Sequence, residues 1–419
     1  MATTSADRIV SLDVIRGIAV MGIFSVNVVG MGLIDAAYDY PPTFGFHTVG
    51  DRIVWAANFI LVDGKLRALF SILFGASSIL VIERGIAAGK RDWQVHYPRM
   101  IVLLLFGLVH FYLLWWGDIL ANYALIGMIV FLFWRLPLRL LVLAAVVVLS
   151  ANYLPMIYFG GHEVSRYEAK ALPSATPAQH AALNKQFAKL HPDAKALAQA
   201  KADHASIPAH VHAMVRDHRW MPFESVSGYG LETLGLMLLG MVGYKSGFVT
   251  GQWRRRAYVN VATIAIGASL VVHGYAAWRI LAAGFSPFTY FRWDEIYVAW
   301  MRPIAALGYS ALIMLLLGNR GAVTARVAAV GRAAFSNYLG ATLIGTLLFF
   351  GFGFGLFNEL SRGQLWLLVP FVWAAMLLWS KPWLDRFRYG PFEWAWRSLS
   401  RWRWEPMRHR TGGPLPVVA

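Results

Sequence analysis

Apolar runs of about the length needed to cross a lipid bilayer recur along almost the whole chain. A transmembrane helix needs about 20 consecutive apolar residues, and ten runs of roughly that length occur in this 419-residue sequence. Because the hydrocarbon core offers the backbone no hydrogen-bond partners, such runs must be helical. The sequence therefore predicts an all-α, polytopic transmembrane helix bundle of about ten spans. The expected spans are residues 16–34, 66–83, 100–117, 119–134, 138–159, 228–248, 257–278, 295–317, 333–355 and 364–380.

Two apolar runs need separate interpretation. The first, from Gly17 to Ile34, is longer than a signal-peptide core and no small-residue cleavage motif follows it. We therefore expect it to remain as a span. Residues 52–62 are shorter and predict either an interfacial helix or part of a span.

The composition supports a membrane protein and argues against a nucleic-acid partner. Hydrophobic residues make up 58% of the chain and charged residues only 14%, which is typical of integral membrane proteins. The net charge of +16 comes mostly from basic residues in short gaps between apolar runs, as membrane topology requires. The absence of cysteine excludes disulfides, thiolate metal sites and cysteine nucleophiles.

The distribution of basic residues predicts the orientation. In the ten-span arrangement, the basic loops and the basic C-terminal tail fall on the same side as the N-terminus, which the positive-inside rule makes cytoplasmic. We therefore expect both termini to be cytoplasmic, in a bacterial inner membrane. The basic residues of the loops are Arg84, Lys90, Arg91, Arg99, Arg135, Arg139, Lys245, residues 254–256, Arg320, Arg326 and Arg332.

One hydrophilic insert divides the chain into parts. We expect an N-terminal transmembrane half at 1–159, a small extracytoplasmic helical insert at 160–222, a C-terminal transmembrane half at 223–380 and a cytoplasmic tail at 381–419. The insert is rich in alanine and lysine, which favour helices. Its histidines lack a firm ligand spacing, so we expect solvated side chains and no metal. They are His162, His180, His191, His204, His210, His212 and His218.

The tail alternates tryptophan with arginine, as in WAWRSLSRWRW. One interpretation is a nucleic-acid stripe. After a final span, however, a segment anchored by tryptophan and by anionic lipid headgroups is favoured. Membrane lipids are therefore the expected partners, and a homodimer is left open.

Polar residues within or beside the spans are the candidates for function, because ionisable groups at membrane depth are costly unless they are paired or face a polar cavity. In the first span, Asp13 and Arg16 are helix neighbours at the cytoplasmic end, and Asn27 lies eleven residues beyond Arg16. A structural ion pair and an interhelical hydrogen bond would also explain these residues.

Three further charges, Asp63, Lys65 and Arg67, stand at the outer start of the second span, where charge should be sparse. Three explanations are open for these charges: they face lipid headgroups, they bind an anionic ligand, or they pair with Asp118.

A histidine inside an apolar run is the most informative of these residues. His110 precedes Asp118 by eight residues, which on one continuous helix is about 12 Å along the axis. We therefore expect the two side chains to line one cavity with Tyr123 without touching directly. An imidazole titrates near neutrality and suits a general base, although a histidine hydrogen-bonded to a neighbouring helix is the structural alternative.

Later spans contribute Glu232, Arg302, Asn337 and Tyr338. Glu232 and Arg302 are strong charges well inside their spans, and both mutual pairing and cavity lining would explain them.

Five motifs together resemble the YeiB-like family of bacterial inner-membrane proteins of unknown function. They occur in family order and cover nearly the whole chain apart from residues 160–222. The motifs are LDVIRGIAVMGIFSVN, GKLRALFSILFGASS, GLVHFYLLWWGDILANYALIG, VGRAAFSNYLGATLIGTLLFFGFGFGLF and FRYGPFEWAWRSL.

The YeiB-like family is distantly similar to transmembrane acyltransferases, which include the acyltransferase-3 enzymes and heparan-α-glucosaminide N-acetyltransferase. The shared element is Arg16-Gly17 followed by a polar residue eleven positions after the arginine. Acyltransferase-3 proteins carry a histidine there, whereas this chain has Asn27, as the heparan type does. The heparan-type histidine lies after the first span, where His47 stands without matching context, so His110 is preferred.

The resemblance implies acyl transfer from acyl-coenzyme A, the expected donor substrate, to a hydroxyl or amine of an extracytoplasmic or lipid-linked acceptor. Arg16 would attract the phosphorylated donor, His110 would deprotonate the acceptor, and Asn27 would stabilise the oxyanion. Asp118 would orient the imidazolium through water or substrate. The alternative is a transporter or flippase for a small solute or lipid that uses intramembrane His, Glu and Arg. A non-catalytic scaffold is the third interpretation.

Overall fold

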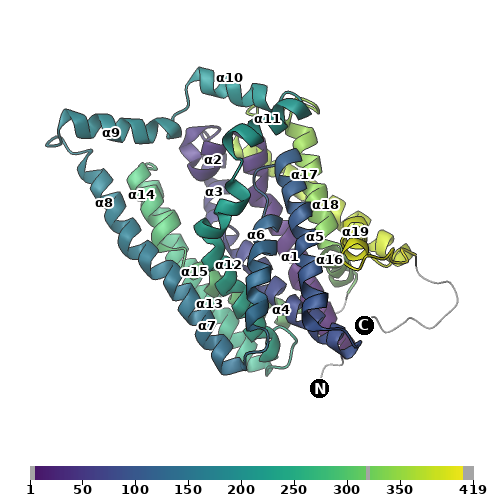
Figure 1. Cartoon of the computed structure of the whole chain (residues 1–419). Helices are drawn as coiled ribbons and strands as arrows, with labels where there is room; N and C mark the ends of the chain where they lie inside the picture. Colours follow the sequence, from purple (N-terminus) through teal and green to yellow (C-terminus); the bar gives the residue numbers. More distant parts are fainter. Residues whose placement is uncertain (1–4, 318–320, 409–419) are drawn as a thin grey trace.

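A computed structural model describes residues 5–317 and 321–408 and consists of apolar helices joined by short connections (Figure 1). Arg320 and residues 409–419 of the predicted tail lie outside this range. The helices of the first half are α1 (Ser5–Gly32), α2 (Asp35–Asp39), η1 (Pro41–Thr43), α3 (Val49–Leu61), α4 (Lys65–Ala87), α5 (Asp92–Leu113), α6 (Leu120–Val130), η2 (Phe131–Phe133), α7 (Leu138–Pro155), η3 (Met156–Gly160), α8 (Gly161–Ala169), α9 (Pro177–Phe187), η4 (Ala188–Leu190), α10 (Ala194–Asp203) and α11 (Ile207–Asp217).

The second half of the chain continues the bundle and contributes its broken span. Two helices, α14 with η5 and then α15, form one bent pair with an angle of 56° at the break. The helices are α12 (Met221–Lys245), α13 (Arg255–Ala282), α14 (Pro287–Phe291), η5 (Arg292–Tyr297), α15 (Met301–Leu316), α16 (Ala322–Arg332), α17 (Ala334–Phe349), α18 (Arg362–Arg386) and α19 (Pro391–Ser400).

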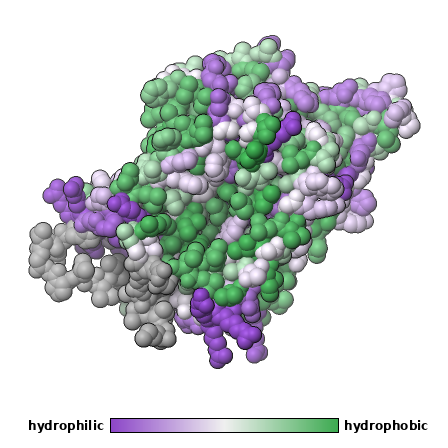
Figure 2. Space-filling view, turned by 180° about the vertical axis from the view of Figure 1, so that it is seen from behind, coloured by the Kyte–Doolittle hydropathy of each residue, from purple (hydrophilic) through white to green (hydrophobic). Residues whose placement is uncertain are grey.

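The prediction of an all-α polytopic bundle is confirmed, and each expected span coincides with a helix. Within the described residues, seven helices are long and apolar enough to cross a membrane, and the bent pair is an eighth if it is one span. The expected spans 119–134 and 333–355 correspond to the shorter apolar helices Leu120–Phe133 and Ala334–Phe349. Hydrophobic side chains dominate the middle of the face in Figure 2, and hydrophilic ones gather toward its edges.

Several boundaries differ from the predictions. The span expected at 100–117 ends at Leu113, because the chain turns back before α6. The helix expected to end at 159 continues through η3 into α8, so that Leu138–Ala169 forms one apolar unit. Residues 52–61 belong to α3, and Val62 is its C-cap. Together with α4, α3 forms the apolar unit Val49–Ala87.

The bundle has two distinct ends. At one, which we call the cap end, α9, α10 and α11 lie across the tops of the long helices (Figure 1). At the other, the tail end, α19 contacts α5 and α17. There the indole of Trp396 donates to the carbonyl oxygen of Arg99 (2.8 Å), and the Glu393 carboxylate accepts from the backbone N–H of Phe335 (2.7 Å). The positive-inside prediction would make the tail end cytoplasmic.

Glycines allow the helices to approach closely in the tail half. A Cβ at Gly240 of α12 would collide with the carbonyl oxygen of Ile72 of α4, and one at Gly75 of α4 would collide with that of Met237. Small residues at such positions let helix backbones come into direct contact. Since the clash is reciprocal, neither glycine of the α4–α12 contact tolerates a side chain without movement.

The insert is helical, as predicted, but its histidines are not all solvated. His204 and His210 are 8% and 0% exposed, and their Nδ1 atoms lie 3.1 Å apart. The His204 ring stacks on Phe350, with ring centroids 4.1 Å apart. The expectation of surface positions is therefore wrong for these two residues, because α10 and α11 pack against the turn after α17.

Candidate functional site

A cavity of about 520 Å³ opens between the helices in the half of the bundle near the cap end. It is bounded by the C-terminal part of α1, the N-terminal parts of α4, α12 and α15, the turn between α5 and α6, and η5. The chain enters or leaves the membrane region at these places, so polar residues at helix ends converge on one chamber.

The cavity brings together seven of the predicted site residues and leaves five out. Its lining includes Asn27, Asp63, Arg67, Asp118, Glu232, Arg302 and Tyr338. The predicted residues outside the lining are Arg16, Lys65, His110, Tyr123 and Asn337.

A buried ion pair crosses the cavity wall. The guanidinium of Arg67 donates to the Glu232 carboxylate at 2.7 Å, and the hydroxyl of Tyr153 donates to the other oxygen of Glu232 at 2.8 Å. The Glu232 side chain is 6% exposed and that of Arg67 is 28% exposed. Glu232 therefore pairs with Arg67 and not with Arg302, because α4 packs directly against α12. Of the two alternatives left open for Glu232 and Arg302, cavity lining is the one that the structure bears out. The alternative that Arg67 pairs with Asp118 is not borne out.

His110 and Asp118 are in direct contact, contrary to the expectation. The Nδ1 atom of His110 lies 2.8 Å from Oδ1 of Asp118, since α5 ends at Leu113 and the following turn returns Asp118 to the histidine. Oδ2 of Asp118 accepts from the N–H of Ala121 (2.7 Å). On the other side, Nε2 of His110 lies 3.0 Å from the Thr342 hydroxyl. The side chains of His110 and Asp118 are each 1% exposed, and Asp118 is the member of this dyad that is part of the cavity lining.

Two proton arrangements satisfy this chain of polar groups. If the Thr342 hydroxyl donates to the carbonyl oxygen of Tyr338 (3.3 Å), then Nε2 of His110 is a donor and the contact with Asp118 holds a second proton. If Thr342 instead donates to Nε2, Nδ1 donates to Asp118. Either arrangement fixes the imidazole ring and couples it to the Asp118 carboxyl group.

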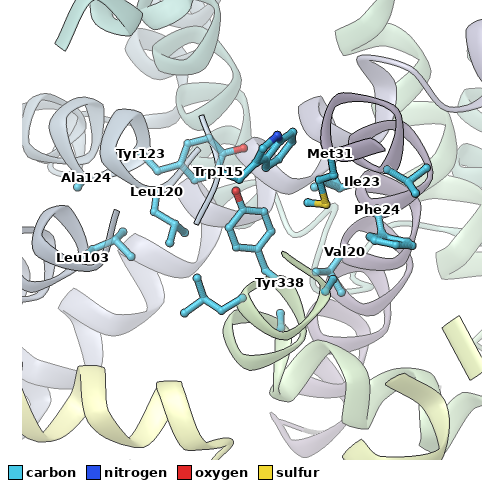
Figure 3. Close-up of a cluster of buried hydrophobic side chains, with 14 of the residues drawn as sticks. Val20, Ile23, Phe24, Met31, Leu103, Trp115, Leu120, Tyr123, Ala124 and Tyr338 are labelled. Carbon is cyan, nitrogen blue, oxygen red and sulfur yellow. The ribbon is translucent and has the colours of Figure 1, made fainter. Parts of the chain in front are cut away.

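Tyr338 forms the wall next to this dyad. Figure 3 shows its ring between side chains of α1 and α6, with its hydroxyl on the side of Trp115. The hydroxyl accepts from the N–H of Ile119 (3.3 Å), and the indole of Trp115 donates to the carbonyl oxygen of Gly30 (2.9 Å). The first contact holds the turn after α5 against α17, and the second holds it against α1.

Lys65 and Tyr123 lie behind the cavity wall. The ammonium of Lys65 is fully buried and donates to the carbonyl oxygens of Phe59 (2.7 Å) and Asp63 (3.3 Å). The Tyr123 hydroxyl lies 2.5 Å from that of Ser71. Both residues stabilise the start of α4, which carries Arg67.

Arg16 and Asn337 lie in the tail half. Arg16 donates to Asp13 (3.0 Å) and to the Ser77 hydroxyl (2.8 Å), which confirms the expected pair with Asp13. The amide of Asn337 donates to Ser380 (3.1 Å) and accepts from Trp379 (2.8 Å). Asn337 thus joins α17 to α18.

The cavity also contains residues that the sequence analysis did not single out. Asp39, Asp294, Glu295 and Arg362 line it, and Arg362 is only 7% exposed. These residues lie in short helices or at helix starts, where charged residues are common. The only sequence feature that could have indicated them is the high density of charged residues in the segments near the cap end. The aromatic lining residues are Tyr38, Trp55, Phe59, Trp115, Trp116, Tyr153, Tyr229, Tyr290 and Tyr338.

We also asked whether any described residues are arranged to bind a metal ion. Among the residues that the structure describes, no group of three or more His, Cys, Asp or Glu side chains is arranged to hold a metal ion. His47, the alternative to His110, is exposed and is absent from the cavity lining.

Comparisons with known proteins identify relatives along the full length. Residues 243–403 match a family described as "Protein of unknown function (DUF418)". The chain is 32% identical to "Uncharacterized protein YeiB" of Escherichia coli (strain K12), over 94% of this chain and 96% of that protein. It is 27% identical to "Uncharacterized protein YxaH" of Bacillus subtilis (strain 168), over 98% of each. No solved structure gives a significant match. The expected resemblance is therefore confirmed, and the chain belongs to the YeiB-like family of proteins of unknown function.

Proposed function

We propose that this chain is an acyltransferase-like protein of the bacterial inner membrane, with its cap end outside the cytoplasm. It moves an acyl group from acyl-coenzyme A to a hydroxyl or amine of an extracytoplasmic or lipid-linked acceptor. The observation that carries the proposal is that Asn27 and Asp118 line the same cavity of about 520 Å³. These residues come from the two motifs that the acyltransferase resemblance and the histidine analysis singled out independently.

The proposed reaction makes one bond and breaks one. The oxygen or nitrogen of the acceptor forms a bond to the acyl carbonyl carbon, and the bond from that carbon to the coenzyme A sulfur breaks. The proton of the acceptor goes to Asp118 at the cavity wall, and Asp118 then gives that proton to the departing coenzyme A thiolate, so that the carboxylate is restored. A positioned base of this kind contributes about 10²–10⁴-fold to a reaction rate.

The buried position of His110 changes the role that we assign to it. Since its Nε2 meets Thr342 and its Nδ1 meets Asp118, the imidazole positions the carboxyl group and shares its proton. Asn27 of α1 also lines the cavity, and its side-chain amide N–H would donate to the developing oxyanion.

The donor would be held at the other end of α1. Arg16 precedes Asn27 by eleven residues, which is roughly 16 Å along a helix. Its guanidinium is 24% exposed, so it has room for a phosphate in addition to Asp13. The donor would therefore extend from Arg16 toward the cavity, parallel to α1.

The bent pair favours a second candidate function, a transporter or flippase. The 56° break between Pro287–Tyr297 and Met301–Leu316 lies next to the cavity, and both sides of it carry lining charges, Glu295 and Arg302. Broken helices around a charged site within the membrane are typical of secondary transporters.

One experiment tests both functions. Purified full-length protein in liposomes receives labelled acetyl-coenzyme A together with membrane lipids and soluble amines as acceptors. We expect label in a lipid or amine product, with Asp118→Asn reducing the rate at least a hundredfold. Glu163→Gln, an exposed side chain of α8, is the matched control.

The outcomes separate the candidates. Unchanged transfer in Asp118→Asn dismisses the assigned proton acceptor. If no labelled product forms and a labelled solute or lipid moves across the bilayer, the protein is a transporter or flippase and not an acyltransferase. His110→Gln should lower the rate less than Asp118→Asn and should alter its pH profile, which a purely structural histidine would not do.

A further inference from the structure

The cavity holds charges of both signs that the protein itself does not pair. Within residues 5–317 and 321–408, ion pairs account for Arg67, Glu232 and Asp118 of the lining. No ion pair in that range involves the other six charged lining residues. These are Asp39, Asp63, Asp294, Glu295, Arg302 and Arg362.

The two arginines are held by backbone atoms only. Arg362 donates through Nη2 to the carbonyl oxygen of Ala37 (2.6 Å), and its buried Nε has no partner. Arg302 donates weakly to the carbonyl oxygen of Asp294 (3.4 Å) and lies against Gly64, where a Cβ would displace it. Carboxyl groups of the same cavity, Asp63 and Asp294, act on both guanidinium groups through space. Neither arginine is in direct contact with a carboxylate in the described part of the chain, so N–H donors of both remain available to the oxygens of an anion.

The carboxyl groups gather around the short helices near the cap end. Asp294 is 4% exposed and shares a hydrogen bond with Glu295, while Asp39 is exposed at the edge of the cavity. With Asp63 they make four carboxyl groups against two unpaired guanidinium groups. Such an excess attracts a cation, and the aromatic walls formed by Tyr38, Trp55 and Tyr290 favour an organic ammonium over a hydrated metal.

A ligand of a single charge would leave one of these groups unsatisfied. Guanidinium groups prefer phosphate or carboxylate, and two of them suit the several oxygens of a phosphate. An ammonium donates several hydrogen bonds and therefore suits a cluster of carboxylates. The ligand must carry both groups within a cavity of about 520 Å³.

We propose that the cavity binds an aminoalkyl phosphate, with its phosphate at Arg302 and Arg362 and its ammonium among Asp39, Asp63, Asp294 and Glu295. This rests on the proposed function only in naming the acceptor, whose amine would be the group that receives the acyl chain. The same chemistry occurs in a free molecule and in the headgroup of an ethanolamine lipid.

The test measures binding, which is independent of transfer. Full-length protein in phosphatidylcholine nanodiscs is titrated with O-phosphoethanolamine, ethanolamine and inorganic phosphate, and the fluorescence of the lining residues Trp55, Trp115 and Trp116 reports binding. We expect O-phosphoethanolamine to bind at least tenfold tighter than either single-charge compound. Equal affinity for all three compounds overturns the proposal without any variant.

Variants assign the two ends of the ligand. Arg362→Gln should weaken O-phosphoethanolamine at least tenfold and leave ethanolamine unchanged, whereas Asp294→Asn should weaken both. Arg279→Gln and Glu163→Gln, exposed residues outside the lining, are the matched controls. If Arg362→Gln does not fold, Arg302→Gln replaces it. Full binding in folded Arg302→Gln and Asp294→Asn proteins contradicts the assignment.

Nanodiscs that contain phosphatidylethanolamine distinguish the sources. If the lipid is the ligand, it competes with O-phosphoethanolamine and remains bound in native mass spectrometry. If the free compound is the ligand, its affinity is the same in nanodiscs with and without phosphatidylethanolamine. Binding of O-phosphoethanolamine without any acyl transfer contradicts the proposed function but supports the binding site. Acyl transfer at equal rates to acceptors with and without a phosphate supports the proposed function but contradicts the binding site.

Discussion

The same three helices, α1, α4 and α12, behave differently in the two halves of the bundle. In the tail half, Gly75 and Gly240 bring α4 and α12 into close contact, and Gly17 brings α1 close to α16. In the cap half they carry Asn27, Arg67 and Glu232 and separate around the cavity. The backbone geometry is helical throughout, so the difference comes from side-chain size and charge.

This difference shows how a membrane bundle can contain a charged cavity and remain stable. Lipid supplies no hydrophobic drive for helix association, so close packing of small residues must hold the helices together. The contact between α4 and α12 supplies that packing in the tail half, which leaves their other ends free to carry charges. Close backbone packing therefore holds α4 and α12 together in the tail half, and the Arg67–Glu232 pair holds them together in the cap half.

The largest expected effect is loss of the one ion pair that joins α4 and α12 in the cap half. Glu232→Gln leaves Arg67 without its counter-charge, and breaking a buried pair costs about 3 kcal/mol. We expect a lower Tm in detergent by several degrees. The double variant Arg67→Met with Glu232→Met should recover most of the loss, because no unpaired charge remains. A Tm unchanged in Glu232→Gln would mean that the pair is solvated and that the cavity half is not held by it.

The sequence was sufficient for the helices but not for the charge pairing. Apolar length placed α1, α12 and α13 because lipid imposes that length directly. The partner of Glu232, in contrast, depends on which helices touch, and no periodicity within one helix carries that information. The sequence left open whether Glu232 pairs with Arg302 or lines a cavity, and it did not indicate Arg67 as the partner.

The site shows the same limit. His110 and Asp118 were found because an ionisable residue in an apolar run is unusual, but their contact depends on α5 ending at Leu113. Nothing in the run from Phe106 to Trp116 marks that end. Arg362 and Asp294 were missed because charges at helix ends are common, and only the tertiary fold brings them to one cavity.

The second largest effect is expected in the tail half. A Cβ at Gly240 would collide with the carbonyl oxygen of Ile72, and overpacking of this kind costs about 1–3 kcal/mol. Gly240→Ala should therefore lower Tm, although alanine is the better helix former. Gly267→Ala on α13, where nothing lies within 4 Å of the added Cβ, is the control and should not lower it. Equal Tm values for Gly240→Ala and Gly267→Ala would show that the close contact between α4 and α12 does not determine stability in the tail half.

The docking of the cap is expected to depend on pH, unlike the tail half. Burial lowers the pKa of His204 and of His210 to about 4, so the docked cap requires both rings neutral. Docking is fully stable above the ordinary histidine pKa of about 6.5 and is lost as the pH falls from there toward about 4. We expect amide hydrogen exchange in α10 and α11 to accelerate at least tenfold between pH 7 and pH 5, with no such change in α4.

Neighbouring groups set the controls for this experiment. His218, whose pKa is raised by its contact with Asp35 (3.5 Å), opposes the effect because that contact strengthens in acid. His212→Gln, an exposed side chain of α11, should leave the pH dependence intact, whereas His204→Gln should reduce it. Exchange in α10 and α11 that is independent of pH would show that the histidine pair does not control docking.

The smallest effect tests whether the two halves differ along a single helix. Gly228 lies on α12 as Gly240 does, but a Cβ at Gly228 meets nothing within 4 Å because the residue lines the cavity. Alanine there gains helix propensity without a clash, so Gly228→Ala should raise stability by about 0.5–1 kcal/mol. Opposite signs of the Tm change at Gly228 and Gly240 are what the cavity and the close contact require. If both substitutions lower Tm alike, α12 is packed equally along its length, and the cavity does not exist as a hydrated space in the folded protein.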